Sequence, residues 1–395
     1  VGQYIRSDAP VHHKSKEVTP TAGGTIFWLF ILIFSIIVNW IYTIPLYEAF
    51  LILFIGGFVI GFYDDLMKIL NKRNLGLRAR DKLFLQFLLT IIIFFILKIN
   101  DLYFVNNFSV NFSSLFFHTN HVDLGWGYLI FLYFFISAVS NATNLTDGLD
   151  GLLASLSLTG FIAYLIIFLI MSNLPLVYLI LGIISFISVF LFFNLPKAKV
   201  FMGDSGSMTI GSIFVYLSII SKTEIYFLFI GYIYFLVTLS VILQVLYFKI
   251  TKGRRLFNFT PLHHHFELMG YNEKEILLKY KEEYKKCRVR AVYQYLQMRR
   301  DDLKRNIARL SKDIKYKNRL EKEKKKIEQK LERKINYYKT LLNDYENAEK
   351  NKAYYENKLT EVNKRIKRIE SEYAELIKSI TTDASTNASA NASTN

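Results

Sequence analysis

Long apolar runs constrain this 395-residue chain more than any other feature of its sequence. A helix that crosses the hydrocarbon core of a bilayer needs about 20 mostly apolar residues. Several runs here carry no charged residue over most of that length, which is rare in water-soluble domains. The sequence therefore predicts an all-α fold, a polytopic membrane helix bundle, with about eight spans at residues 24–42, 46–63, 83–99, 125–142, 151–171, 174–193, 206–221 and 225–248.

The charged residues gather in the last third of the chain. The formal net charge is +16, and residues 276–380 alone hold 31 Lys and Arg against 17 Asp and Glu. We predict three parts: a membrane-embedded domain at 1–275, a charged helical or coiled-coil tail at 276–380, and a disordered end at 381–395. Because the positive charge lies in the tail, we predict no nucleic-acid partner. The single cysteine, Cys287, excludes a disulfide scaffold.

The basic loop residues predict which way the bundle faces. Loops on the cytoplasmic side of membrane proteins are enriched in Lys and Arg. One set of loops holds only Lys98 and Lys222, so we expect it to face outward. Both chain ends are predicted to lie on the other, cytoplasmic side, whose loops carry Lys68, Lys72, Arg73, Arg78, Arg80, Lys82, Lys197, Lys199, Lys249, Lys252, Arg254 and Arg255.

Polar clusters follow the predicted spans, and all of them fall on the predicted cytoplasmic side. Acidic residues at the ends of apolar spans are costly to place, which makes each a functional candidate. We expect one site built from these loops, comprising Asp64, Asp65 and Lys68; Asn144, Asp147 and Asp150 in NATNLTDGLDGL; Asn194 and Asp204 in NLPKAKVFMGDSGS; His263, His264 and His265 in PLHHHFE; and Lys16 and Thr21 in KSKEVTPTAGG.

The residue types at this site indicate a hard cation and a phosphorylated substrate. Mg²⁺ prefers carboxylate and phosphate oxygens, and lysines meet phosphates as point charges. Taken singly, the motifs have simpler interpretations: a solvated helix cap for Asp64-Asp65, an ordinary loop for TDGLDG and a solvated run for the histidines. Three adjacent histidines would make a poor structural zinc site, because they do not converge as i, i+4 pairs do. Phosphoryl transfer accounts for the whole set.

Five stretches in a fixed order make the site recognisable: GQYIRSDAPVHHKSKEVTPTAGG, GFYDDLMK, NATNLTDGLDGL, FNLPKAKVFMGDSGS and PLHHHFELMGYNE. Together they cover residues 2–273 and resemble the phospho-N-acetylmuramoyl-pentapeptide transferases (the MraY family) among the polyprenyl-phosphate N-acetylhexosamine-1-phosphate transferases. The resemblance implies that undecaprenyl phosphate attacks UDP-N-acetylmuramoyl-pentapeptide, giving lipid I and UMP in peptidoglycan biosynthesis. It also implies Mg²⁺ as cofactor, the bacterial cell membrane as location and a homodimer as one oligomeric state.

The resemblance implies roles for the residues at matching positions. Asp204 would be the Mg²⁺ ligand, and Asp64 and Asp65 would lie nearest the lipid phosphate, with Asp64 as base. His263 would complete the catalytic set. The remaining matches imply substrate contacts by Lys16, Thr21, Lys68, Asn144, Asp147, Gly148, Leu149, Asp150, Asn194, Phe201, Gln244, His264 and His265.

We expect the chain to depart from the family pattern at both ends. Family members have ten spans, and the resemblance implies that this sequence lacks the first, because it starts where that helix would already have reached the cytoplasm. After Glu273 the segment KEILLKYKEEYKKCRVRAVYQYL takes the place of the last span, and it is too charged to cross a membrane. Two other functions stay open. One is a sister transferase that uses UDP-N-acetylglucosamine, and the other is a catalytically impaired membrane scaffold with an interaction tail.

The tail carries a heptad pattern at its end. Apolar residues from Leu359 to Ile380 recur at alternating steps of three and four, which is typical of a coiled coil. A single solvated helix is the simpler alternative. We predict that the tail binds itself or another helix, and its positive charge also suits anionic lipid headgroups.

Overall fold

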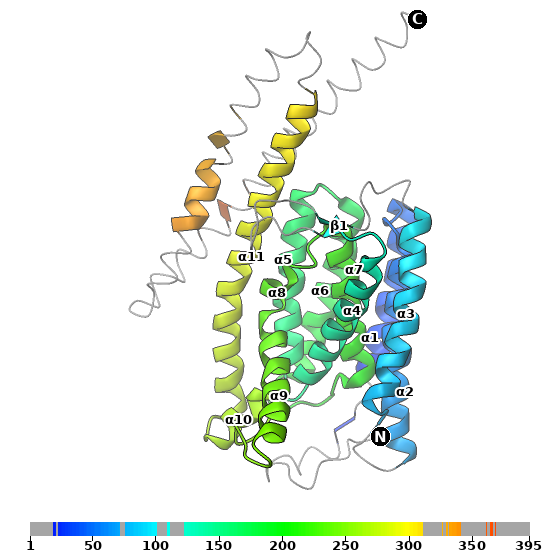
Figure 1. Ribbon diagram of the computed structural model, residues 1–395, viewed down its shortest axis with the longest axis vertical. Helices are drawn as coiled ribbons and strands as arrows, with labels where there is room; N and C mark the ends of the chain where they lie inside the picture. The colour runs from blue at the N-terminus through cyan, green and yellow to red at the C-terminus, as the bar shows by residue number, and fades with distance from the viewer. Residues whose placement is uncertain are drawn as a thin grey trace, which may run out of the picture.

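The computed structural model describes residues 19–20, 23–71, 76–100, 109–110 and 122–310, with short stretches beyond these at 326, 329–330, 332–340, 361, 364–365 and 368. Within these ranges the chain is a helix bundle with one short hairpin, as Figure 1 shows. The all-α prediction is confirmed. Lys16, Thr21 and the heptad residues from Leu359 to Ile380 lie outside the described residues.

All eight predicted apolar runs form helices, although the last is divided into α8 and α9. Seven of the helices are long and apolar enough to cross a membrane: α1, α2, α3, α4, α5, α6 and α9. In chain order the elements are α1 (Gly23–Tyr42), α2 (Tyr47–Leu70), α3 (Ala79–Ile99), β1 (Ser109–Val110), β2 (Val122–Asp123), α4 (Gly127–Thr146), α5 (Leu152–Ile170), α6 (Leu174–Asn194), α7 (Gly203–Ser221), α8 (Phe227–Ile230), α9 (Tyr232–Ile250), α10 (Leu262–Leu268) and α11 (Glu273–Leu310).

The seventh predicted span, 206–221, is α7, and the composition of this helix reflects its place at the centre of the bundle. Every residue from Ser205 to Ser221 is buried. Many of them are Ser, Thr or Gly, which lowers the hydropathy below that of a lipid-facing helix. Their hydroxyls bond within the helix, as Thr209 Oγ1 does to the Ser205 carbonyl at 2.6 Å. A helix that meets protein on all sides can therefore be more polar than its neighbours.

Glycines on α2 allow α7 to approach closely. Gly57 and Gly61 are one turn apart, and a Cβ at either position would overlap α7, at Ser212 and at the backbone carbonyl of Asp204 respectively. Small residues at this spacing let two membrane helices pack backbone to backbone. The close approach brings the end of α2 beside the beginning of α7.

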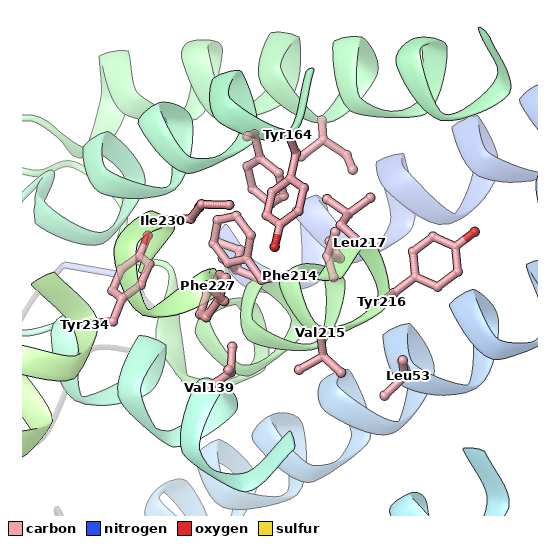
Figure 2. Close-up of a cluster of buried hydrophobic side chains, with 14 of the residues drawn as sticks. Leu53, Val139, Tyr164, Phe214, Val215, Tyr216, Leu217, Phe227, Ile230 and Tyr234 are labelled. Carbon is pink, nitrogen blue, oxygen red and sulfur yellow. The ribbon is translucent and has the colours of Figure 1, made fainter. Parts of the chain in front are cut away.

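An aromatic cluster fills the middle of the bundle, and Figure 2 shows its members converging from α5, α7, α8 and α9. Phe214 stacks on Phe161 with ring centroids 4.3 Å apart and also contacts Phe227 at 5.4 Å. Beside them the Tyr164 hydroxyl bonds Ser218 Oγ at 2.5 Å, which satisfies both buried hydroxyls. Apolar side chains also cover the outside of the bundle, with Trp40 85% exposed, as expected where the solvent is lipid.

The short hairpin lies at one end of the bundle. Ser109 pairs with Asp123 and Val110 with Val122 in antiparallel register. In Figure 1 it lies at the end opposite α10. Lys98 at the end of α3 places its ammonium 4.0 Å from the Trp126 ring centroid, close to the hairpin, an arrangement typical of membrane-interface residues.

The first part of the charged tail packs on the bundle. The buried side chains of α11 that join the main apolar core are Ile276, Leu277, Tyr280, Tyr284, Ala291 and Tyr295. In Figure 1 α11 starts at α10, runs beside α9, α8 and α5, and continues past the opposite end of the bundle. It is not among the helices apolar enough to span. The domain boundary at residue 275 stays a prediction, but the contacts tie α11 to the apolar core of 23–250.

Candidate active site

Three carboxylates converge where α2 ends and α7 begins. Asp64 and Asp65 lie in the last two turns of α2, and Asp204 is the second residue of α7. One oxygen from each lies within 4.8 Å of the others. The glycine contacts between α2 and α7 set this distance, so the site depends directly on the packing of the two helices.

Two lysines lie within ion-pair distance of the three aspartates. Lys68 Nζ lies 2.8 Å from Asp64 Oδ2, 2.8 Å from Asp204 Oδ1 and 3.4 Å from Asp65 Oδ1. Lys82 Nζ lies 3.0 Å from Asp64 Oδ1 and 3.2 Å from Asp204 Oδ2. The sequence pattern placed Lys82 only among the basic loop residues. Its place just before the predicted span 83–99, on the predicted cytoplasmic side, is a sequence signal that points to it, but other basic loop residues share that signal.

Backbone amides fix the orientation of the α2 carboxylates. Asp65 accepts from the amides of Asp204 and Ser205 at 3.2 and 2.9 Å, so it caps the N-terminus of α7, where the helix dipole favours a negative charge. Asp64 is buried and accepts from the Leu77 amide at 2.7 Å. Both side chains are therefore held in place before any ligand binds.

The end of α4 lies beside the acidic cluster. Asn144 donates from Nδ2 to Ser207 Oγ at 3.0 Å, which joins α4 to the first turn of α7. Asp147 follows the last residue of α4. Burial, and then the negative charges of Asp204 and Asp65, raise the pKa of Asp147 to about 8. These two predicted residues therefore lie near the aspartates from α2 and α7.

Two predicted substrate residues bond neighbouring loops instead of pointing into open space. Asp150 Oδ2 accepts from the Ala198 amide at 2.9 Å. Asn194 accepts from the Gly151 amide at 3.1 Å and donates to the Val200 carbonyl at 2.8 Å. Both side chains are buried. They fix the loop after α4 against the loop before α7. They therefore have this structural role in addition to any contact with substrate.

The three histidines lie on α10 and have different surroundings. His263 is fully buried against Gly148, where any added Cβ would overlap its Nε2. His264 Nδ1 is 2.6 Å from Glu267 Oε2. His265 Nδ1 accepts from the Asn258 amide at 3.3 Å. His263 is thus the histidine that joins α10 to the TDGLDG loop.

The other predicted residues are positioned by backbone bonds. Gln244 Oε1 accepts from the amides of Leu256 and Phe257 at 3.1 and 2.8 Å, which fixes the loop between α9 and α10. The Phe201 amide donates to the Pro20 carbonyl at 2.9 Å, so the N-terminal segment runs beside the loop before α7. Leu149 is buried within the TDGLDG loop.

The donor set fits a divalent cation. Three carboxylates supply hard oxygens, which suit Mg²⁺. The Lys68 ammonium contacts all three, which shows that the cluster accommodates a positive charge near its centre. The family resemblance implies Asp204 alone as the metal ligand; the geometry adds Asp64 and Asp65 as residues that could hold the ion. Carboxylates, lysines and histidines at one end of a membrane bundle can together bind and align phosphates.

Comparison with known proteins shows the family. The profile of glycosyl transferase family 4 matches residues 47–222. The phospho-N-acetylmuramoyl-pentapeptide-transferase of Listeria welshimeri is 38% identical over 282 residues, 71% of this chain and 85% of that protein. The Bacillus velezensis protein of the same name is 39% identical over 281 residues, 71% of this chain and 84% of that protein. The chain therefore belongs to glycosyl transferase family 4, whose members transfer a phospho-hexosamine to a polyprenyl phosphate, and is a relative of its phospho-N-acetylmuramoyl-pentapeptide-transferases.

Proposed function

We propose that this chain transfers phospho-N-acetylmuramoyl-pentapeptide from its UDP carrier to undecaprenyl phosphate, giving lipid I and UMP. The observation that carries the proposal is the convergence of Asp64, Asp65 and Asp204 with Lys68 and Lys82 at one end of a membrane bundle. In the reaction, an oxygen of the lipid phosphate forms a bond to the β-phosphorus of the nucleotide. The bond from that phosphorus to the oxygen bridging to the α-phosphate breaks, and UMP leaves with this oxygen.

The residues of the cluster have complementary roles in this proposal. Asp64, Asp65 and Asp204 would hold Mg²⁺, which supplies charge neutralisation on the phosphates when bound. Lys68 and Lys82 add two more positive charges to the same place. Asp64 is the candidate base for a protonated lipid phosphate, and the Leu77 amide fixes its direction. Phosphoryl transfer depends mainly on such alignment and charge.

The sugar substrate is the finer part of the proposal. Two observations favour the muramoyl-pentapeptide: the PLHHHFE motif and the activity for which the relatives that are 37–39% identical are named. UDP-N-acetylglucosamine is the second candidate. The test measures UMP release by membranes that contain the chain and undecaprenyl phosphate, with each UDP-sugar in turn. We expect release from UDP-N-acetylmuramoyl-pentapeptide only; release from UDP-N-acetylglucosamine alone would overturn the substrate assignment.

The site end of the bundle is proposed to face the bacterial cytoplasm, where UDP-sugars are made. The basic residues around it support this, including Lys68, Lys82, Lys199 and Arg254. A non-catalytic scaffold is less well supported, because all three aspartates and both lysines are in contact. The chain termini, which we also predict to be cytoplasmic, lie outside the described residues.

A further inference from the structure

The histidine helix α10 is joined to α11 by a tightly defined corner. At the end of α10 the Gly270 amide donates to the Glu267 carbonyl at 3.0 Å, and the Tyr271 amide donates to the Phe266 carbonyl at 3.2 Å. Gly270 has φ +92°, a conformation that favours glycine. These bonds make a Schellman motif, and the Phe266 and Tyr271 rings pack together across it, 6.1 Å apart.

The beginning of α11 is defined equally well. The Asn272 amide donates to Glu275 Oε2 at 2.9 Å, and the Glu275 amide donates to Asn272 Oδ1 at 3.0 Å. This reciprocal pair is a capping box, which satisfies amides that the first turn of a helix leaves without partners. Only four residues separate α10 from α11. The direction of α11 therefore fixes the direction of α10.

Two residues of the charged segment hold this corner. Tyr280 is buried in the apolar core, and its ring lies 6.4 Å from the Phe266 ring in an edge-on arrangement. Lys279 places its ammonium 4.3 Å from the centre of the Tyr271 ring and 5.5 Å from that of Phe266, which is within cation–π range. Ile276 and Leu277, one turn earlier, are buried and fix α11 on the bundle.

At its other end α10 is held against the site by a hydrogen bond and a close contact. The Leu262 amide donates to Ser240 Oγ of α9 at 3.1 Å. His263 lies directly on Gly148, the first glycine of the TDGLDG loop. A shift of α11 would therefore move the histidines relative to the loop that carries Asp147 and Asp150.

We propose that α11 positions the three histidines through Tyr280 and Lys279, so that the first turns of the charged segment belong to the transferase site. The inference rests on the proposed function, and it assigns positioning roles to residues that follow the recognised motifs. Neither side chain touches the acidic cluster in the described contacts, so each acts through Phe266 and α10. The acidic cluster is built from residues of α2, α3 and α7, and no described contact joins it to α11.

The main test uses Tyr280→Ala, Tyr280→Phe and the control Leu278→Ala, with purified protein in detergent and the UDP-sugar that supports UMP release. The Tyr280 hydroxyl has no hydrogen-bond partner among the described residues, so the ring alone should suffice. Leu278 is 60% exposed on the same turn. We expect Tyr280→Ala to lower kcat/KM on the order of 10- to 100-fold, as small misplacements of aligned groups do. Tyr280→Phe and Leu278→Ala should match the unmodified protein.

A second readout separates positioning from loss of the fold. Because the acidic cluster does not include α11, the Mg²⁺ concentration for half-maximal rate should stay unchanged in Tyr280→Ala while KM for the nucleotide rises. Lys279 is exposed, so Lys279→Gln should fold normally and lower kcat/KM in the same direction. Lys279→Arg keeps the cation and should restore the rate.

Several results would overturn the inference. One is an active Tyr280→Ala with unchanged kcat/KM. Another is a loss that Tyr280→Phe does not restore, or that comes with an equal loss of Mg²⁺ response, since either indicates a general structural role. Failure of the proposed function is distinct: the unmodified chain would then release no UMP from either UDP-sugar. If the unmodified chain prefers UDP-N-acetylglucosamine, the same comparison runs on that substrate.

Discussion

Asp147 lies at the end of α4, and burial makes its charged form costly there. Burial and the nearby charges of Asp204 and Asp65 raise its pKa to about 8, whereas an Asp in an unfolded chain titrates near 4. Between these values the folded protein binds a proton that the unfolded chain has lost. The contribution of this group to stability therefore falls as pH rises from about 4 through 8.

Replacing Asp147 by Asn should remove that pH dependence. In detergent with a chelator present, we expect the melting temperature of Asp147→Asn relative to the unmodified protein to increase between pH 6 and pH 9. Thermal unfolding followed by intrinsic fluorescence at both pH values measures the difference. A difference that stays constant, or shrinks, would contradict the raised pKa.

Gly148 is the residue against which His263 packs. A methyl group there would overlap His263 Nε2, and the His263 side chain is fully buried. We expect Gly148→Ala to lower kcat/KM for the nucleotide at least about tenfold, because His263 or the TDGLDG loop must shift. Gly127→Ala is the matched control, since its nearest neighbour is 3.9 Å away. Equal UMP-release rates for the two variants would show that the contact is unimportant.

At this scale the sequence predicted the residue types of the site better than their contacts. Charged residues at the ends of apolar spans are energetically costly, so each is a functional candidate. This principle singles out Asp64, Asp65, Lys68 and Asp204. Lys82 could not be separated from ordinary basic loop residues, because its partners come from two other helices. The loop-bonding contacts of Asp150 and Asn194 are likewise tertiary, and no spacing reveals them.

At the scale of helices, the α2–α7 contact sets the geometry of the acidic cluster. Gly61 lies against the Asp204 backbone, so a Cβ there would push the beginning of α7 away. We expect Gly61→Ala to destabilise the protein by about 1–3 kcal/mol and to raise the Mg²⁺ concentration needed for half-maximal rate. UMP release measured across a Mg²⁺ titration, alongside thermal unfolding, tests both expectations.

Gly56 is the control on the same helix. Its added Cβ would meet only the movable end of the Leu89 side chain, so Gly56→Ala should leave the Mg²⁺ response unchanged. If both variants behave alike, the close approach of α2 and α7 does not set the metal response.

The sequence predicts a helix where contact with lipid alone requires a long run of apolar residues. Helices that face lipid over much of their surface, such as α1, must be mostly apolar, and their runs are plain in the sequence. The central position of α7 was not predictable, because it depends on which helices surround it. The same holds for the contact of α11 with α5 and α8: a charged segment gives little sign that Tyr280 and Tyr284 will be buried. The heptad pattern from Leu359 to Ile380 remains a prediction.

At the scale of the whole molecule, the site and the β1–β2 hairpin lie at opposite ends of the bundle. The basic loops predict that the site faces the cytoplasm, and in that case the hairpin should face outward. Cys287 is the only cysteine, and Cys287→Ala gives a background for single-cysteine labelling. We expect Val122→Cys to react with a membrane-impermeant maleimide in intact cells and Lys199→Cys only after permeabilisation. The reverse pattern would mean that the bundle is inserted the other way round.

The most direct measurement is the Mg²⁺-dependent release of UMP by Asp204→Asn. An amide cannot supply the negative charge that a hard cation needs, and Asp204 also holds both lysines. We expect turnover to fall by about two orders of magnitude or more, on the scale of lost metal-ion catalysis. Asp81→Asn, which replaces a half-exposed carboxylate that pairs with Arg80, should keep full activity. Equal turnover by Asp204→Asn and the unmodified protein would contradict a metal-assisted transferase built on the three aspartates.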